Sequence, residues 1–160
     1  MRHLLPVVLP MALCLSAPAF AGPVLDAHLT TATPTSSASE ADVKLGTGLG
    51  ARVGLPLDLG IARLVPEAGL TAWNGQGLLV PELGARASIG AGIEPGAYGH
   101  LLFPMPTPGG PTRGWDAGGS LAFTMLPVDI GVRAGLLGLS GPAMEPTTYL
   151  TAGIDVGFSF

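Results

Sequence analysis

The chain has 160 residues and a formal net charge of −4, which suits a single domain and offers no basic surface for nucleic acid. Charged residues make up 11% of the sequence, against about 25% in typical soluble proteins, whereas glycine (25 residues) and proline (16 residues) are abundant. This composition leaves too few polar groups for a water-soluble surface, and a mean hydropathy of +0.52 disfavours disorder.

The first segment, residues 1–21, has the features of a secretory signal peptide. A basic start is followed by an apolar stretch, and Ala19 and Ala21 supply the small residues that cleavage requires. A membrane anchor fits less well, because prolines interrupt a stretch that is short for a bilayer. We expect cleavage after Ala21, which removes Cys14, the one cysteine of the chain, and leaves 22–160 as one β-barrel domain.

The rest of the chain alternates apolar residues with small or polar ones, which is typical of β-strands that expose one face to oil. The last segment shows this alternation most clearly, with the apolar series Leu150, Ala152, Ile154, Val156, Phe158 and Phe160. Eight strands are predicted on this basis: 23–33, 42–55, 59–73, 78–91, 93–103, 114–126, 128–138 and 148–160. Segment 59–73 needs a bulge near Arg63 to keep its apolar residues on one face.

Short turns and longer connections alternate between these strands. The turns are predicted at 56–58, around Gly92 and at 127–129, and the longer connections at 34–41, 74–77, 104–113 and 139–147. An even number of strands with both ends on one side is what barrel closure requires. The sequence therefore predicts an all-β fold, an antiparallel up-and-down transmembrane β-barrel of about eight strands.

Aromatic residues are expected in girdles at the two ends of such a barrel. Trp73, Phe103, Trp115 and Tyr149 lie beside the longer connections, and Phe123, Phe158 and Phe160 lie near the opposite end. Tyr98 falls on the inward-facing parity instead.

Charged residues share the glycine face of the strands, which predicts a charged interior. The expected lumen charges are Lys44, Arg52, Glu82, Arg86, Glu94, Asp116, Arg133 and Asp155, together with Asp26, His28 and His100 on the same parity. Because an unpaired buried charge is costly, we interpret these residues mainly as ion pairs that fill the barrel interior. The many inward glycines leave a narrow water-filled channel as the alternative.

No catalytic or metal-binding motif stands out. His100, Asp116 and Ser120 are on adjacent strands, but three such residues arise easily by chance. His28 and His100 are not at ligand spacing, and the carboxylates are scattered. We therefore predict no enzyme activity, no metal and no cofactor.

The signal peptide, the alternating strands and the terminal Gly157-Phe158-Ser159-Phe160 resemble small bacterial outer-membrane β-barrel proteins. The resemblance implies a Gram-negative cell outer membrane as the location, contact with outer-membrane lipid, and recognition by the barrel-assembly machinery through Phe158 and Phe160. That family usually has glycine five residues before the last aromatic residue, where this chain has Asp155.

Three functions stay open at this point. The expected one is a structural or surface-interaction barrel without a catalytic site. The first alternative is a small, porin-like passive channel for ions or small solutes, and the second is a soluble secreted β-barrel that binds an apolar ligand.

Overall fold

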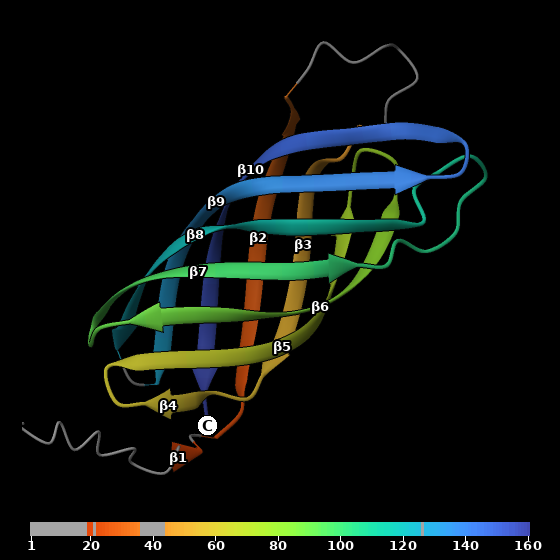
Figure 1. The fold of residues 1–160 in the computed structure, drawn as a ribbon. Helices are drawn as coiled ribbons and strands as arrows, with labels where there is room; N and C mark the ends of the chain where they lie inside the picture. The colour runs from red at the N-terminus through yellow and green to blue at the C-terminus, as the bar shows by residue number, and fades with distance from the viewer. Residues whose placement is uncertain (1–18, 21, 36–43, 126) are drawn as a thin grey trace, which may run out of the picture.

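The computed structural model describes residues 19–20, 22–35, 44–125 and 127–160, which form an antiparallel β-barrel (Figure 1). Its strands are β1 (Ala19–Phe20), β2 (Val24–Pro34), β3 (Gly46–Gly54), β4 (Leu57–Leu59), β5 (Ala62–Trp73), β6 (Leu78–Ile89), β7 (Ile93–Leu102), β8 (Arg113–Met125), β9 (Val128–Gly141) and β10 (Met144–Ser159). Within the described residues, no helix is long and apolar enough to cross a membrane.

Pairing between β10 and β2 closes the barrel. The two strands are antiparallel, with Ser159 opposite Val24 and Tyr149 opposite Pro34, and the other strands pair around the wall through β9, β8, β7, β6, β5 and β3. Since β4 prolongs β3, the barrel has eight strands, and the predicted all-β up-and-down architecture is confirmed. The end at which β2 begins and β10 ends is called the terminal rim, and the opposite end the loop rim.

The predicted turn at 56–58 is wrong, because the chain continues as a strand through this segment. β4 keeps the register of β3 against β5. Pro56 has no N–H for the ladder and so interrupts it, but its buried side chain continues the inward alternation. The chain reverses at 60–61, where Gly60 has a φ of 79°, as the first position of a type II′ hairpin turn requires.

This turn also removes the need for the bulge predicted near Arg63. Ile61 lies in the turn and not in a strand, so its apolar side chain does not have to share a face with those of β5. Pairing of β5 with β6 runs in unbroken register from Ala62 to Trp73.

The other connections match the prediction in part. The turn around Gly92 and the connection at 74–77 are present, and 103–112 joins β7 to β8. Val128 already begins β9, opposite Met125, so of the turn predicted at 127–129 only residue 127 lies outside a strand. Residue 126 is outside the described part of the chain. The predicted loop at 34–41 lies mostly outside them too.

The loop predicted at 139–147 is wrong. β9 and β10 extend toward each other and leave only residues 142–143 between them. Leu139 is buried inside the barrel and therefore continues the alternation of β9 beyond residue 138. Proline and glycine in this stretch, which indicated a loop, instead accompany a register shift between Met144 and Thr147.

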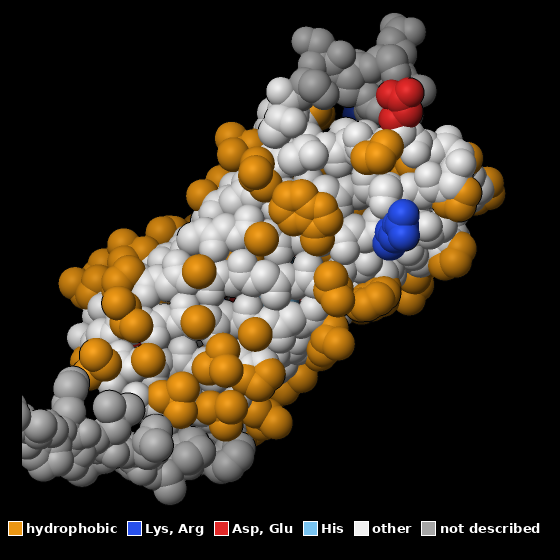
Figure 2. Space-filling view, in the orientation of Figure 1, with side chains coloured by type: hydrophobic (Ala, Val, Ile, Leu, Met, Phe, Trp, Pro, Cys, Tyr) orange, Lys and Arg blue, Asp and Glu red, His pale blue; other side chains and the backbone are white. Residues whose placement is uncertain are grey.

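The outer wall of the barrel is apolar. Outward side chains such as Leu49, Val53, Leu83, Val132 and Ile154 are about half exposed or more. In Figure 2 hydrophobic side chains are spread over the wall with white areas between them, and the few charged side chains that are visible lie in the upper half of the view. Each strand thus presents its apolar face outward and its polar face to the interior.

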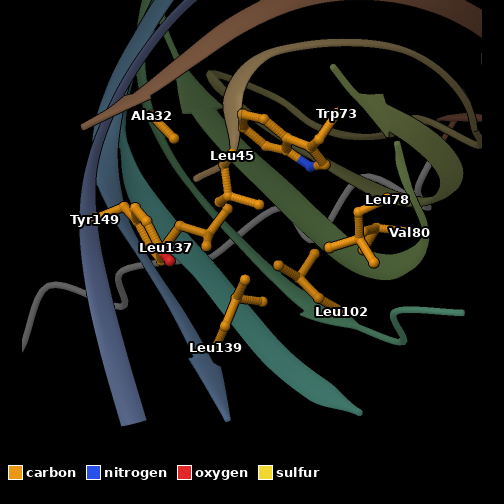
Figure 3. Packing of buried hydrophobic residues seen from close by; sticks show 9 residues of the cluster. All are labelled: Ala32, Leu45, Trp73, Leu78, Val80, Leu102, Leu137, Leu139 and Tyr149. Carbon is orange, nitrogen blue, oxygen red and sulfur yellow. The ribbon is translucent and has the colours of Figure 1, made fainter. Parts of the chain in front are cut away.

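An apolar cluster fills the interior at the loop rim (Figure 3). Its buried members come from seven stretches of the wall: Ala32, Leu45, Trp73, Leu78, Val80, Leu102, Leu137, Leu139 and Tyr149. Trp73 and Tyr149 are therefore not in an outer aromatic girdle, and that part of the prediction is wrong. Trp115 and Phe103 do face outward near this rim, as Phe123, Phe158 and Phe160 do near the other.

Of the predicted signal peptide, residues 1–21, only Ala19–Phe20 belong to the described residues. They form β1 and pair with β4, Ala19 opposite Asp58. The other residues of that segment lie outside the described part of the chain.

Candidate functional site in the barrel interior

A network centred on Arg52 fills the middle of the barrel. Arg52 comes from β3, and its guanidinium group donates to both carboxylate oxygens of Glu82 on β6, with Nε 2.8 Å from Oε1 and Nη2 3.4 Å from Oε2. Both side chains are almost fully buried. The strand β5 lies between β3 and β6 in the wall, so this pair spans part of the lumen.

Thr71 and His28 extend this network. The hydroxyl of Thr71 donates to Glu82 Oε1 at 3.2 Å, and His28 Nε2 lies 2.8 Å from the same hydroxyl oxygen. Arg52 Nη2 also lies 3.5 Å from His28 Nε2. In the tautomer with its proton on Nε2, His28 donates to Thr71, whose own proton goes to Glu82. In that tautomer the histidine does not act as a base toward this hydroxyl.

A second set of ion pairs joins β2, β5, β6 and β7. His100 Nε2 lies 2.7 Å from Glu67 Oε1. Arg86 lies between two carboxylates, with Nη2 3.7 Å from Glu67 Oε2 and Nη1 3.5 Å from Asp26 Oδ2. Because β6 and β2 are not neighbours in the wall, the contact of Arg86 with Asp26 crosses the lumen.

Aromatic rings complete the filling on the β7–β8 side. Tyr98 stacks on His100 with ring centroids 5.6 Å apart, and the guanidinium carbon of Arg133 lies 5.6 Å from the centroid of the Tyr98 ring. The Tyr98 hydroxyl donates to Asp116 Oδ1 at 3.5 Å, and Arg133 also donates to the hydroxyl of Thr30. Cation–π attraction of this kind is stronger when water is excluded.

Inward glycines make room for these rings. A Cβ at Gly135 would lie 2.6 Å from the Tyr98 hydroxyl oxygen, and one at Gly118 2.8 Å from it. At Gly50 a Cβ would lie 2.5 Å from two ring atoms of His28. The space beside these three glycines is thus occupied by side chains.

Most of the predicted lumen charges lie in the barrel interior, but they are not all equally buried. Arg52, Glu82, Asp116, Arg133 and Asp155 are fully buried in the interior, as are Asp26, His28 and His100. Arg86 is partly buried beside them, and Glu94 lies nearer the terminal rim, where it accepts from Ser88 at 2.8 Å and Thr124 at 3.0 Å.

Lys44 does not belong to this interior set. It is exposed and precedes β3, whereas the next residue, Leu45, is buried. Gly46 has a φ of 69°, a left-handed conformation that breaks the extended chain, so the alternation of β3 cannot be continued back to Lys44.

Glu67 is the interior carboxylate that the sequence analysis missed. It is 5% exposed and holds both His100 and Arg86. The irregular apolar pattern of segment 59–73 concealed its inward direction. Placing the turn at Gly60 would have revealed it, since Arg63, Val65 and Glu67 then alternate inward.

The constellation of His100, Asp116 and Ser120 does not form a catalytic arrangement. Asp116 is directly opposite His100 between β7 and β8, but Ser120 is opposite Gly96, four positions along. His100 bonds Glu67, and within the described residues neither histidine has a serine as a hydrogen-bond partner.

Comparison with known structures bears on the fold. The barrel is similar to that of Neisserial surface protein A. The two chains are 15% identical, with a TM-score of 0.50, and the match covers 86% of this chain and 98% of the other. At this identity the likeness concerns the fold alone. A comparison of the sequence with protein-family models gives no match, and neither does a comparison with curated protein sequences.

Proposed function

We propose that the chain is an integral outer-membrane β-barrel protein with a structural or surface-interaction role and no catalytic function. The observation that carries this proposal is that the outward side chains are apolar while charged residues form ion pairs inside the barrel. This is the opposite of the arrangement in a soluble protein. An outer wall of this kind is stable in lipid, whereas in water it would expose a large contiguous apolar surface.

The aromatic residues that face outward support a membrane location. Phe103 and Trp115 lie near the loop rim, and Phe123, Phe158 and Phe160 lie near the terminal rim. Each of these side chains is at least 44% exposed. Aromatic side chains at both ends of an apolar band are typical of the two membrane interfaces.

The filled interior favours a structural role over a passive channel. A permeating ion would have to pass the apolar cluster at the loop rim and the Arg52–Glu82 pair below it. Within the described residues these groups are almost fully buried, so a conducting path would require them to move apart.

The same filling disfavours a soluble barrel that holds an apolar ligand. Side chains of the apolar cluster already occupy the part of the lumen in which such a ligand would bind. A surface role would fall to the connections at the loop rim, of which 103–112 is the longest in the described part of the chain and exposes Met105.

Assembly through the terminal strand belongs to the same proposal. β10 carries Phe158, which is opposite Leu25 on β2 and Val128 on β9, and Phe160 follows the strand and donates its N–H to the carbonyl of Pro23 at 3.2 Å. By recognising Phe158 and Phe160, the barrel-assembly machinery would bind the end of β10, the strand that closes the barrel.

Fractionation of the producing cells tests the location. We expect the protein in the outer-membrane fraction, with different electrophoretic migration before and after boiling, because a closed barrel stays folded in detergent until it is heated. A protein that partitions into the aqueous phase with unchanged migration would contradict the proposal and favour the soluble barrel.

Recording from planar bilayers tests the role. Pure folded protein should show no steady unitary current steps. Regular steps that scale with protein concentration would refute the structural role and establish the channel.

A further inference from the structure

Three side chains that could ligate a metal ion converge inside the barrel. Asp26 and His28 are two residues apart on the inward face of β2, and Asp155 on β10 is directly opposite His28. One ligand atom from each of the three lies within 4.8 Å of the other two. The strand pairing that closes the barrel thus assembles the cluster.

Each of the three residues has a buried polar atom without a hydrogen-bond partner. These atoms are Asp26 Oδ1, His28 Nδ1 and Asp155 Oδ1, and the three residues are 3%, 2% and 5% exposed. A buried polar group left without a partner destabilises the fold, and more so when it is charged. Three such atoms on one cluster indicate a missing partner.

The hydrogen bonds of His28 leave Nδ1 ready to bind a cation. The Thr71 hydroxyl donates to Glu82, and it accepts from His28 in the tautomer that has its proton on Nε2. In the neutral ring the lone pair is then on Nδ1. A ligating histidine whose other nitrogen donates to a fixed acceptor is the usual arrangement around protein-bound metals.

The nearby arginines do not satisfy the two carboxylates. Arg52 Nη1 and Arg133 Nε are each 3.6 Å from Asp155 Oδ1, beyond hydrogen-bond distance, and Arg52 is already bound to Glu82. Arg86 approaches the other oxygen of Asp26, Oδ2. Asp155 Oδ1 thus has two ion-pair contacts but no hydrogen bond, and Asp26 Oδ1 has no hydrogen-bond partner.

The charge balance of the interior points the same way. Among the described residues, five carboxylates are fully buried: Asp26, Glu67, Glu82, Asp116 and Asp155. Two guanidinium groups are fully buried, those of Arg52 and Arg133, and Arg86 is 21% exposed. Buried carboxylates therefore outnumber buried guanidinium groups, an imbalance that a bound cation would reduce.

We propose that Asp26, His28 and Asp155 form a binding site for a divalent transition-metal ion inside the barrel, with zinc as the best match. Two carboxylates and one imidazole are ligands that Zn²⁺ accepts in proteins, with a water in the fourth position. Ligand atoms around zinc are separated by roughly 3.3 Å at metal–ligand distances of about 2.0–2.1 Å. Small side-chain rotations would close the present separation to that value.

An approach to the site exists from the terminal rim. A cavity there is lined by charged residues of both signs, Arg63, Arg86, Glu94 and Asp129, and reaches Asp155. This inference concerns the interior and does not depend on the membrane location proposed above.

Zinc titration of the protein, purified folded in detergent and stripped with a chelator, tests the site. We expect one Zn²⁺ bound per chain by isothermal titration calorimetry, and a higher urea midpoint when zinc is present. His28→Gln and Asp155→Asn should each weaken zinc binding at least tenfold, because each removes one of three protein ligands.

His100→Gln is the matched control, since His100 is equally buried but bonds Glu67 outside the cluster. It should bind zinc as the wild type does. The proposal is overturned if the folded wild type takes up no stoichiometric zinc, or if His28→Gln and His100→Gln bind equally. Heat-modifiable migration verifies the folding of each variant, and Asp26→Asn replaces any variant that fails to fold.

Discussion

Replacing Ile154 with arginine measures whether the outer wall meets lipid. Ile154 is 53% exposed on β10, and its cross-strand neighbours Leu29 and Val132 also face outward. It is the midpoint of the outward series from Leu150 to Phe158. That series spans roughly 27 Å along the strand at about 3.4 Å per residue.

The expected cost follows from this position. With a strand tilt of about 45°, the series covers roughly 19 Å of an apolar band about 25 Å tall, which places Ile154 near the bilayer midplane. Ile154→Arg should therefore lower the free energy of unfolding in vesicles by ~2–4 kcal/mol. The assay is reversible urea unfolding in lipid vesicles, followed by tryptophan fluorescence.

Ile61→Arg is the matched control. Ile61 is 83% exposed in the turn at the terminal rim, where a charge can reach water, and the expected cost is ~0–1 kcal/mol. Equal costs at Ile154 and Ile61 would show that the wall does not face a bilayer, and would refute the reasoning behind the proposed location.

The interior makes three further predictions, all measured by urea unfolding of protein in detergent. Arg52→Met should cost ~3–5 kcal/mol, because it leaves Glu82 buried and unpaired; adding Glu82→Met should recover a large part of the loss, and full additivity of the two would refute the pairing. Leu137→Ala should cost ~2–5 kcal/mol by opening a cavity in the apolar cluster, whereas Leu136→Ala on the outer wall should cost clearly less; a reversed order would refute the assigned faces. Gly135→Ala should cost ~1–3 kcal/mol, because its Cβ would overlap the backbone carbonyl of Ala117 and the Tyr98 hydroxyl, and an unchanged midpoint would refute this close packing.

The architecture was predictable from the sequence because every strand of a barrel in lipid alternates outward apolar residues with inward polar or small ones. The apolar series from Leu150 to Phe158 faces outward as the alternation indicates, and the turn around Gly92 is where glycine permits it. Closure between the first and last long strands followed from the even strand count.

The incorrect predictions concern residue types that are common in two different structural settings. Pro56 indicated a turn, but a proline also fits an extended strand at a position where its missing N–H is tolerated. Trp73 and Tyr149 were assigned to a girdle because aromatic rings are common there, yet inward parity and space at the loop rim place them in the apolar cluster. Local pattern alone does not distinguish these cases.

The contacts between side chains inside the lumen could not be predicted from the sequence, for a different reason. The alternation predicted the inward direction of Asp26, His28 and Asp155, but their proximity depends on the register between β2 and β10. A shift of two residues would keep every side chain on its face and would still separate His28 from Asp155.

The pairing of β2 with β10 has a consequence for the order of folding. Nearly the whole described chain lies between Leu29 and its partner Ile154, and closing a loop of that length costs on the order of 4 kcal/mol in chain entropy. This cost is recovered only when the last residues are in place, so barrel formation is governed by a contact of very high sequence separation. Until then β2 and β9 each present an unpaired edge, and the incomplete barrel is the species most prone to pair with other chains.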